Sequence, residues 1–438
     1  MSIADTFESR KNDPRWNTSY PLSPTDWAQY RVDKPLSFDN DKELSFYIHI
    51  PFCKQLCSFC EYTRMICPDE REQLSYLHAV DSDVSSFVAR HPDIRLRGFD
   101  IGGGTPTALS EANFDYLLQI YFDAISCLEL SDDYEPSIEG TFNTLTERKI
   151  ESIVKRGIRR LSLGIQSTDS SILCSHQREY NDIAAMAKWM HMAWAKGIEK
   201  INLDLMYGLM GQSLASIDAD LYTIQHLKPQ QVTLYELRTN MIAVKDIPSK
   251  DILFQQYRHY YDGLLALGYK ADFGANTFSL DEHDKGVSSY LRSRMFEAIP
   301  YKGFGISAQS MSSEGVSYNV GKNSNGIRSL LSQETFQEEY TYLLPPDELA
   351  AKRVAIAAYN GYLNMDFFDK CDKGKKEEVV EALQFCLDNN LLSRMGNSSY
   401  RITSVGFKYY GAVFSLFIKH QQRKTTVKAY PIGQMRKI

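Results

Sequence analysis

Over residues 44–275, this sequence alternates short β-rich runs with amphipathic segments, and this alternation restricts the fold more than any other feature. The β-rich runs are LSFYIHI from Leu44, RGFDI from Arg97, PSIEG from Pro136, IRRLSLGI from Ile158, EKINLDL from Glu199 and QQVTLYEL from Gln230. Between them, residues 71–91, 146–157, 183–197 and 217–227 carry apolar side chains at spacings of three and four, which predicts helices that cover one face of a sheet. The repetition predicts an α/β fold whose parallel sheet forms an open or closed β/α barrel.

The other segments predict smaller additions to this core at residues 44–275. Residues 1–43 are polar and rich in proline, so we expect an N-terminal arm, extended rather than folded as a domain. The alternation stops near residue 275, and we expect a post-barrel extension over residues 276–340. Two helical patterns, a turn and a short strand predict a small helical or winged-helix-like domain at residues 341–420. A basic tail follows at residues 421–438.

The composition excludes several classes of protein. Of the 438 residues, 43% are hydrophobic and 24% are charged, which is typical of a globular enzyme and not of a disordered chain. Residues 401–438 contain eight Lys and Arg and no Asp or Glu, so the remainder is acidic and lacks the basic stripe of a nucleic-acid-binding protein. No apolar run is long enough for a membrane helix, and the first residues show no apolar signal segment. We therefore expect a cytoplasmic protein that binds neither nucleic acid nor a membrane.

Three of the eight cysteines form the motif Cys53-x3-Cys57-x2-Cys60, directly after the predicted strand YIHI. In a reducing cytosol, clustered cysteines are read as metal-binding or catalytic before they are read as disulfides. A structural zinc site needs four protein ligands, and no Cys or His pair at zinc spacing stands nearby. Three thiolates suit a [4Fe-4S] cluster that leaves one iron open for another ligand. We therefore predict that these three cysteines ligate such a cluster.

The cysteine spacing resembles that of the radical SAM superfamily, in which the open iron binds the amino and carboxylate groups of S-adenosylmethionine (SAM). The stretch GGGTP from Gly102 follows the second predicted strand, where glycines in that superfamily let the backbone approach the methionine amino group. The resemblance implies a partial (β/α)6 radical SAM barrel with two cofactors, a [4Fe-4S] cluster and SAM. It also implies a reducing partner such as flavodoxin or ferredoxin.

Within that superfamily, the chain resembles the oxygen-independent coproporphyrinogen III oxidases and their relatives over nearly its whole length. The similar segments are YIHIPFC from Tyr47, CSFC from Cys57, SIE from Ser137, RLSLGIQ from Arg160, Arg178, and NLDLMYGL from Asn202. The resemblance implies a SAM pocket formed by Tyr47, Phe59, Gly103, Gly104, Thr105, Glu139, Gln166, Arg178 and Asp204. The chemistry fits, because carboxylates such as Glu139 and Asp204 accept hydrogen bonds from hydroxyl or amino groups, and Arg178 can pair with the methionine carboxylate.

Three further segments resemble the oxidases in particular. They are NTSYP from Asn17, GFGISAQSM from Gly303, and YRIT from Tyr400 with the nearby Gly406. The activity that this resemblance implies is reductive cleavage of SAM to a 5′-deoxyadenosyl radical, which starts the oxidative decarboxylation of coproporphyrinogen III in heme (porphyrin) biosynthesis. The small-molecule substrate would then be a tetrapyrrole. Its four carboxylates would need cationic partners, for which the candidates are Arg64, Arg238, Arg292 and Arg294.

Two departures from the family pattern leave other functions open. The oxidases carry a fourth cysteine two positions after the third, where this chain has Tyr62, and an aromatic residue at this position is also seen in related C-methyltransferases. The heme-chaperone branch carries a His-Asn pair and a Trp where this chain reads LRSRMF from Leu291. The alternatives are a radical SAM C-methyltransferase or cyclising enzyme with another substrate, and a non-catalytic heme chaperone, against which the missing His-Asn pair counts. Cys67 lies seven residues past the cysteine motif, and we expect that its side chain could approach the cluster site.

Overall fold

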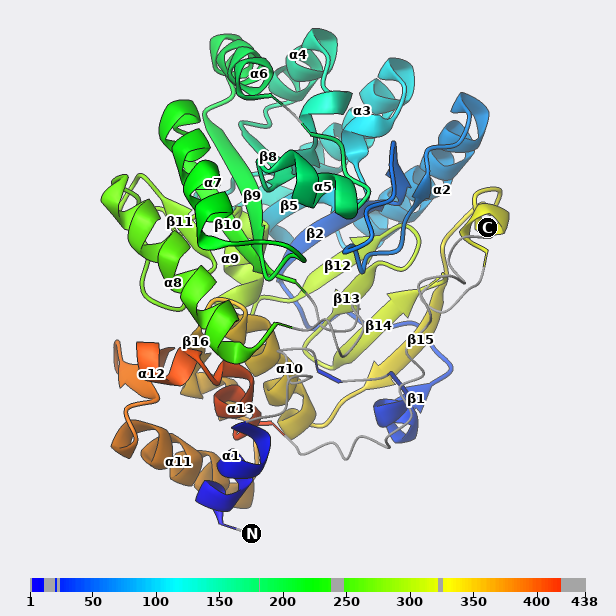
Figure 1. Cartoon of the computed structure of the whole chain (residues 1–438). Helices are drawn as coiled ribbons and strands as arrows, with labels where there is room; N and C mark the ends of the chain where they lie inside the picture. The colour runs from blue at the N-terminus through cyan, green and yellow to red at the C-terminus, as the bar shows by residue number, and fades with distance from the viewer. Residues whose placement is uncertain are drawn as a thin grey trace.

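The structure, a computed structural model, is built around one large sheet and describes residues 2–11, 20–21, 24–180, 182–237, 248–321 and 326–418 (Figure 1). Its strand order is β1-β15-β14-β13-β12-β2-β5-β7-β8-β9-β10-β11. The six predicted strands are β2 (Glu43–Ile50), β5 (Arg95–Gly103), β7 (Ser137–Gly140), β8 (Arg160–Gln166), β9 (Lys200–Tyr207) and β10 (Gln231–Glu236). All of their mutual pairings are parallel, which confirms the predicted α/β fold.

Helices connect these strands and cover the outer face of the curved sheet (Figure 1). They are α2 (Glu70–Arg90), α3 (Glu111–Ser126), α4 (Glu147–Lys155), α5 (Ser170–Ser175), α6 (Ile183–Lys196), α7 (Leu214–Leu227) and, after β10, α8 (Lys250–Ala266). The four predicted helices are α2, α4, α6 and α7, whereas α3, α5 and α8 were not singled out from the sequence. None of the described helices is long and apolar enough to cross a lipid bilayer.

Alternation along the parallel strands divides their side chains between two faces of the sheet. On β5, Phe99 is fully buried and packs edge-on against Tyr121 of α3, with ring centroids 5.0 Å apart. Its neighbour Asp100 points to the opposite, inner face, where it accepts a 2.6 Å hydrogen bond from the Ser288 hydroxyl. The outer face therefore forms the apolar core with the helices, and the inner face carries polar groups.

The predicted post-barrel extension continues the same sheet. β12 (Tyr301–Phe304) pairs parallel with β2, and the antiparallel strands β13 (Gln309–Met311), β14 (Gly315–Asn319), β15 (Glu338–Leu343) and β1 (Arg31–Val32) follow it. At the other end, β11 (Thr277–Ser279) adds to β10 in the antiparallel sense. The parallel core is therefore flanked on both sides by antiparallel strands.

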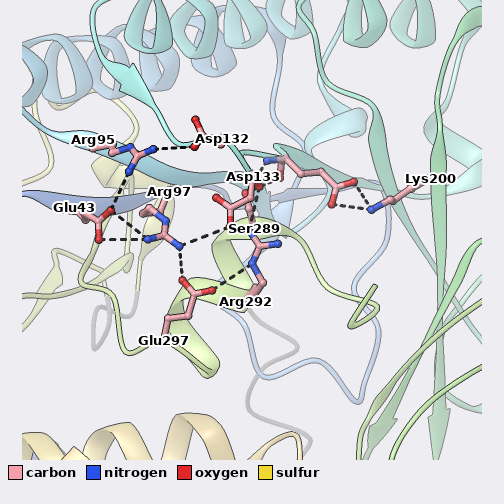
Figure 2. Close-up of polar contacts among 10 residues, drawn as sticks. Glu43, Arg95, Arg97, Asp132, Asp133, Lys200, Ser289, Arg292 and Glu297 are labelled. Atoms are coloured by element: carbon pink, nitrogen blue, oxygen red, sulfur yellow. Dashed lines mark hydrogen bonds and ion pairs between the residues drawn. The ribbon is translucent and has the colours of Figure 1, made fainter. Parts of the chain in front are cut away.

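Helix α9 (Ser289–Met295) contributes Arg292 to a network of ion pairs at the amino ends of the strands (Figure 2). Arg292 of this helix lies 2.6 Å from Asp133 and 3.5 Å from Glu297. Glu297 also lies 2.6 Å from Arg97, which reaches Glu43 at the start of β2 at 3.2 Å. The network therefore lies at the end of the barrel opposite the loops that follow the strands.

The C-terminal part consists of helices and a three-stranded sheet, β16-β18-β17. Its elements are α10 (Pro346–Ala358), β16 (Tyr362–Asn364), α11 (Lys373–Asp388), β17 (Leu392–Arg394), β18 (Ser399–Ile402), α12 (Ser404–Phe407) and α13 (Tyr410–Ser415). This arrangement agrees with the predicted helical or winged-helix-like character, while the domain boundaries stay predictions. The basic tail lies outside the described residues.

The N-terminal arm differs from the expected extended segment, because α1 (Ile3–Lys11) is a helix. It lies beside the C-terminal part (Figure 1), where Phe7 contacts Phe385 and Tyr409 at ring-centroid distances of 5.7 and 6.2 Å. Phe7, the buried apolar residue of this short helix, packs against residues that are distant in sequence. The local sequence therefore did not indicate a helix. Residues 17–19 of the NTSYP segment lie outside the described part of the chain.

A buried hydrogen-bond cluster fixes the next part of the arm to α10. The Glu348 carboxylate accepts hydrogen bonds from the Tyr20 hydroxyl at 2.5 Å and from Trp27 Nε1 at 2.9 Å. Lys352, one turn further along α10, donates to the Tyr20 carbonyl at 2.8 Å. Trp27 is fully buried. Because burial deprives a carboxylate of water, these donors are needed to stabilise it.

We expect Tyr20→Phe to weaken this attachment, because it removes one hydrogen bond to a buried carboxylate and leaves the ring in place. The free energy of unfolding should fall by about 1.5–3 kcal/mol, as measured by urea titration. Tyr222→Phe is the matched control, since that ring is 55% exposed, and its effect should stay within about 0.5 kcal/mol. Equal stabilities of Tyr20→Phe and the wild type would contradict this account of the arm.

Candidate functional site

The three motif cysteines lie in a loop that leaves the carboxyl end of β2. Cys53 ends the short strand β3 (Phe52–Cys53), which pairs with β4 (Met65–Ile66). The loop between these strands contains Cys57 and Cys60, and the Cys67 amide closes it by donating to the Cys53 carbonyl at 2.9 Å. None of these cysteines is in a disulfide. The loop therefore presents three free thiols at the mouth of the barrel.

Hydrogen-bond donors surround the thiols. The Thr105 hydroxyl lies 3.8 Å from Cys53 Sγ, and Arg178 Nη1 lies 3.5 Å from Cys57 Sγ. Arg64 donates to the Cys57 carbonyl at 2.6 Å. Burial raises the pKa of the Cys53 thiol to about 11 and raises that of Cys60 as well. Such buried sulfurs favour their neutral form unless a positively charged metal centre or nearby donors stabilise the thiolates.

No three His, Cys, Asp or Glu side chains in the described parts of the chain meet closely enough to hold a single metal ion. A [4Fe-4S] cluster does not need such a meeting point, because each cysteine ligates a different iron. The donor set of three free cysteines in one loop fits the cluster. Cys67 is occupied in the loop itself, with its thiol 3.4 Å from the Ala108 carbonyl and 3.3 Å from Gln73 Nε2.

The glycine segment at residues 102–104, at the carboxyl end of β5, packs directly against the cysteine loop. A Cβ atom on Gly104 would lie 2.9 Å from Cys53 Sγ, and one on Gly102 would lie 2.4–2.6 Å from the Glu139 carboxyl group. Gly103 has a φ of 112°, which favours glycine, and its amide donates to Glu139 at 3.1 Å. Any side chain here would fill the space between the loop and the carboxylate, so the glycines keep this cradle open.

Two carboxylates and two guanidinium groups line the inner face beyond the glycines. Asp204 of β9 accepts hydrogen bonds from Asn202 at 2.7 Å and from the Ser162 hydroxyl at 3.5 Å. Burial raises the pKa of Glu139 to about 8, and the charge of Asp204 adds to this rise. Burial likewise raises the pKa of Asp204, against the opposing charges of Arg160 and Arg178.

Gln166 and Arg178 converge above β8. A Cβ atom on Gly164 would meet Gln166 Nε2 at 2.6 Å and Arg178 Nη2 at 3.2 Å, and Arg178 donates to the Gly164 carbonyl. Gln166 adopts a φ of 69°, an uncommon conformation for a residue other than glycine, at the point where the strand ends. Arg178 thus connects the end of β8 with Cys57 of the cluster loop.

Aromatic side chains close two sides of the site. Tyr47 of β2 stacks on Tyr290 of α9 with ring centroids 5.6 Å apart. Phe59 lies 5.7 Å from the His176 ring and packs against a small apolar cluster at the ends of β9 and β10. The members of that cluster are Ile172, Met206, Leu209 and Leu237. These contacts shield the site from water on the side of the loop.

The structure thus brings the nine predicted SAM-pocket residues and the three cysteines to one end of the barrel, while their individual roles stay predictions. The four arginines that were candidates for binding ligand carboxylates do not lie together. Arg64 belongs to the cluster loop, Arg292 belongs to the ion pairs of Figure 2, and Arg294 lies among tyrosines. Arg238 lies outside the described residues. Tyr62 is 58% exposed on the loop.

Sequence reasoning missed two charged residues inside the barrel, Asp100 and Arg160. Arg160 donates to the Ser137 hydroxyl at 2.7 Å and to Gln231 Oε1 at 2.8 Å. Burial raises the pKa of Asp100 to about 7, although Ser288 and Arg160 oppose the rise. Both residues lie in predicted strands at positions that alternate with apolar ones. That alternation was the available signal for an inner polar face.

A family model described as the radical SAM superfamily matches residues 47–221 of this chain. This segment contains the cysteine loop, the glycine cradle and every predicted SAM-pocket residue. Proteins of this superfamily bind a [4Fe-4S] cluster and SAM. The cysteines, the cradle and the surplus of carboxylates fit these two groups, because SAM carries a positively charged sulfonium and an ammonium group.

Curated relatives carry two different names. The heme chaperone HemW of Haemophilus influenzae is 29% identical over 52% of this chain and 61% of its own length, and that of Bacillus subtilis is 30% identical over 44% and 50%. The chain thus spans only about half to three fifths of these relatives. The oxygen-independent coproporphyrinogen III oxidase of Salmonella typhimurium is 25% identical over 70% of both chains.

The solved structure of the coproporphyrinogen III oxidase HemN from Escherichia coli, described as a radical SAM enzyme, has the same fold. It covers 92% of this chain and 97% of its own, with a TM-score of 0.73 and 20% sequence identity. The match extends well beyond residues 47–221 and includes most of the flanking elements. Residues 47–221 therefore form a radical SAM domain, and the chain as a whole has the fold of the solved coproporphyrinogen III oxidase structure.

Proposed function

We propose that this protein holds a [4Fe-4S] cluster on Cys53, Cys57 and Cys60, binds SAM in the adjoining polar cradle, and uses this site next to a tetrapyrrole ligand. The observation that carries the proposal is the position of the three free thiols, whose loop packs against a glycine segment that also contacts the half-buried carboxylate of Glu139. When bound, the cluster and SAM supply one-electron chemistry that removes a hydrogen atom from a C–H bond.

The protein's own part in this chemistry is binding, orientation and exclusion of water. Glu139 and Asp204 can accept hydrogen bonds from the amino group and hydroxyls of SAM, and Arg178 lies beside Cys57 where it can bind a carboxylate. Phe59 and its apolar neighbours keep water from the loop side. A dry, fixed pocket matters because a reactive carbon centre must meet one C–H bond before it meets solvent.

Two tetrapyrrole functions are compatible with this site, and the relatives favour heme binding over the oxidative decarboxylation that the sequence motifs indicate. The relatives with identities near 30% are named heme chaperones, whereas the matched oxidase is 25% identical. Tyr62 at the place of the oxidases' fourth cysteine also counts against decarboxylation, whereas the absence of the chaperones' His-Asn pair near Leu291 counts against heme binding. The oxidase stays the second candidate, because its match covers 70% of both chains.

One anaerobic experiment separates these functions. The purified protein is reconstituted with iron and sulfide and is then divided between a heme titration and an incubation with SAM, dithionite and coproporphyrinogen III. Saturable heme binding without protoporphyrinogen supports the chaperone function. Protoporphyrinogen with matching 5′-deoxyadenosine supports the oxidase. If the protein neither binds heme nor converts coproporphyrinogen III, the tetrapyrrole assignment is overturned. If it also fails to bind SAM, the proposed SAM site is overturned too.

We expect Cys60→Ser to abolish the cluster, because an alcohol does not replace a thiolate ligand to iron. Iron after reconstitution should fall from about four atoms per chain to background, and SAM binding should be lost with it. Cys127→Ser is the matched control, since Cys127 is an exposed free cysteine after α3. If Cys60→Ser retained the iron content of the wild type, the ligand set would be wrong.

The raised pKa of Glu139 predicts the pH dependence of stability without SAM. Folded Glu139 keeps its proton up to about pH 8, whereas the unfolded residue releases it near pH 4.5. Between these values the folded state binds more protons, so its stability decreases as the pH rises. Glu139→Gln has no such proton to release. Its Tm at pH 9 should therefore exceed that of the wild type by about 2 °C or more, while the two should agree near pH 5.

Thermal unfolding of the ligand-free protein measures this difference. Glu129→Gln is the control, because the Glu129 side chain is 74% exposed, and its Tm should follow that of the wild type at both pH values. A Glu139→Gln variant whose Tm falls with pH as steeply as the wild type would show that Glu139 is ionised and solvated in the folded protein.

A further inference from the structure

Arg294 differs from its helix neighbour Arg292 because, in the described residues, its charge has no carboxylate partner. In the described residues, it is placed in no ion pair, and its one side-chain hydrogen bond of stated geometry runs from Nη1 to the Tyr290 hydroxyl at 3.4 Å. Its Nε atom is buried and unpartnered. The guanidinium lies over the ring of Tyr301, with Cζ 4.6 Å from the centroid. A positive charge is thus held by aromatic rings.

Arg292, two residues earlier on the same short helix, shows the contrasting case. It is bound by Asp133 at 2.6 Å and by Glu297 at 3.5 Å in the network of Figure 2. Residues two positions apart on a helix lie about 200° apart around its axis. Arg292 therefore faces the ion pairs at the base of the barrel, and Arg294 faces the other way, toward β12.

The surroundings of Arg294 belong to the inner face of the barrel. Tyr301 lies beside Ser45 and Gly303 lies beside Tyr47 in the register of β12 and β2, so Tyr301 shares the face of Tyr47. Tyr290, which receives the hydrogen bond from Arg294, stacks on Tyr47 at 5.6 Å. Only one layer of aromatic rings therefore separates the guanidinium from the predicted SAM pocket.

Close packing keeps α9 in this position. A Cβ atom on Gly98 would lie 2.2 Å from the Tyr290 amide nitrogen, so the helix backbone rests directly on β5. Ser288, which caps the helix, donates to Asp100 at 2.6 Å. The location of Arg294 thus follows from a fixed helix and not from a mobile surface side chain.

A half-buried guanidinium with no counter-ion is unfavourable by itself, because stacking on a ring replaces only part of its lost hydration. Arginine presents a planar set of donors that matches the two oxygens of a carboxylate. A stacked guanidinium keeps the edge of that plane free for such a partner. The position therefore suits a negatively charged ligand that enters the barrel.

We propose that Arg294 binds a carboxylate of the ligand held inside the barrel. Because tetrapyrroles such as heme and coproporphyrin carry propionate groups, this inference rests on the proposed function and deepens it. Arg294 would set the orientation of the macrocycle by holding one propionate at the α9 side, while Tyr47 and Tyr290 provide aromatic surface. It takes no part in binding the cluster.

The test compares Arg294→Gln with Arg292→Gln, which removes the neighbouring charge from the same helix. Both variants are reconstituted with the cluster, and binding of coproporphyrin III is measured through quenching of its fluorescence. We expect Arg294→Gln to weaken binding about tenfold or more, the usual loss for one charge-assisted hydrogen-bonded pair, and Arg292→Gln to bind as the wild type does. Iron content and SAM binding should be unchanged in both.

Equal porphyrin affinity in Arg294→Gln and the wild type would overturn the proposal, and so would an equal loss in Arg292→Gln. If the wild type binds no coproporphyrin III while its iron content and SAM binding are normal, the tetrapyrrole assignment fails. The carboxylate site at Arg294 is then tested with glutarate, a simple dicarboxylate. Glutarate should then raise the Tm of the wild type and of Arg292→Gln but not of Arg294→Gln. An equal rise in all three proteins would overturn the carboxylate site as well.

Discussion

The strict alternation of side chains along the parallel strands is the constraint on which the rest of this structure depends. A strand such as β5 buries Phe99 and Ile101 under helices and turns Asp100 and Gly102 to the inside. Because the period of a strand is two, a shift of one residue would exchange the apolar and polar faces. The same pattern that makes the core therefore also builds a polar interior.

The polar interior has an uneven charge distribution. In the described residues, Asp100, Glu139 and Asp204 lie near the guanidinium groups of Arg160 and Arg178, and burial raises the pKa of each of the three carboxyl groups. The cradle around these three carboxyl groups is therefore favourable for a cation. Proteins keep such arrangements at functional sites, since a well-packed apolar interior would be more stable. The uneven charge is thus a property of the binding site and not of the fold.

Much of this could be predicted from the sequence because local patterns determine it. The six parallel strands have clear apolar runs, and the cysteine spacing indicated a cluster loop at the end of β2. The strands β12 to β15 are short, and they join the large sheet through the pairings of β12 with β2 and of β15 with β1, which are distant in sequence, so no local pattern predicts their place in it. The helix α1 is similar, because Phe7 is buried only by residues of the C-terminal part. The alternation along β5 and β8 assigns Asp100 and Arg160 to the face away from the apolar core, but their partners Ser288 and Gln231 come from distant segments, so their contacts could not be predicted.

The two arginines of α9 show most clearly what sequence cannot decide. Both were equivalent candidates for binding ligand carboxylates, because their spacing and local composition are alike. Their difference comes from the rotation of the helix about its axis, which Gly98 and the Ser288 hydrogen bond to Asp100 fix. With that rotation set, Arg292 contacts Asp133 and Glu297 at the amino ends of the strands. Arg294 then points inward and lies among tyrosines. The rotation that brings one arginine to the ion pairs thus leaves the other without an acidic partner among the described residues, which makes its charge available to a ligand.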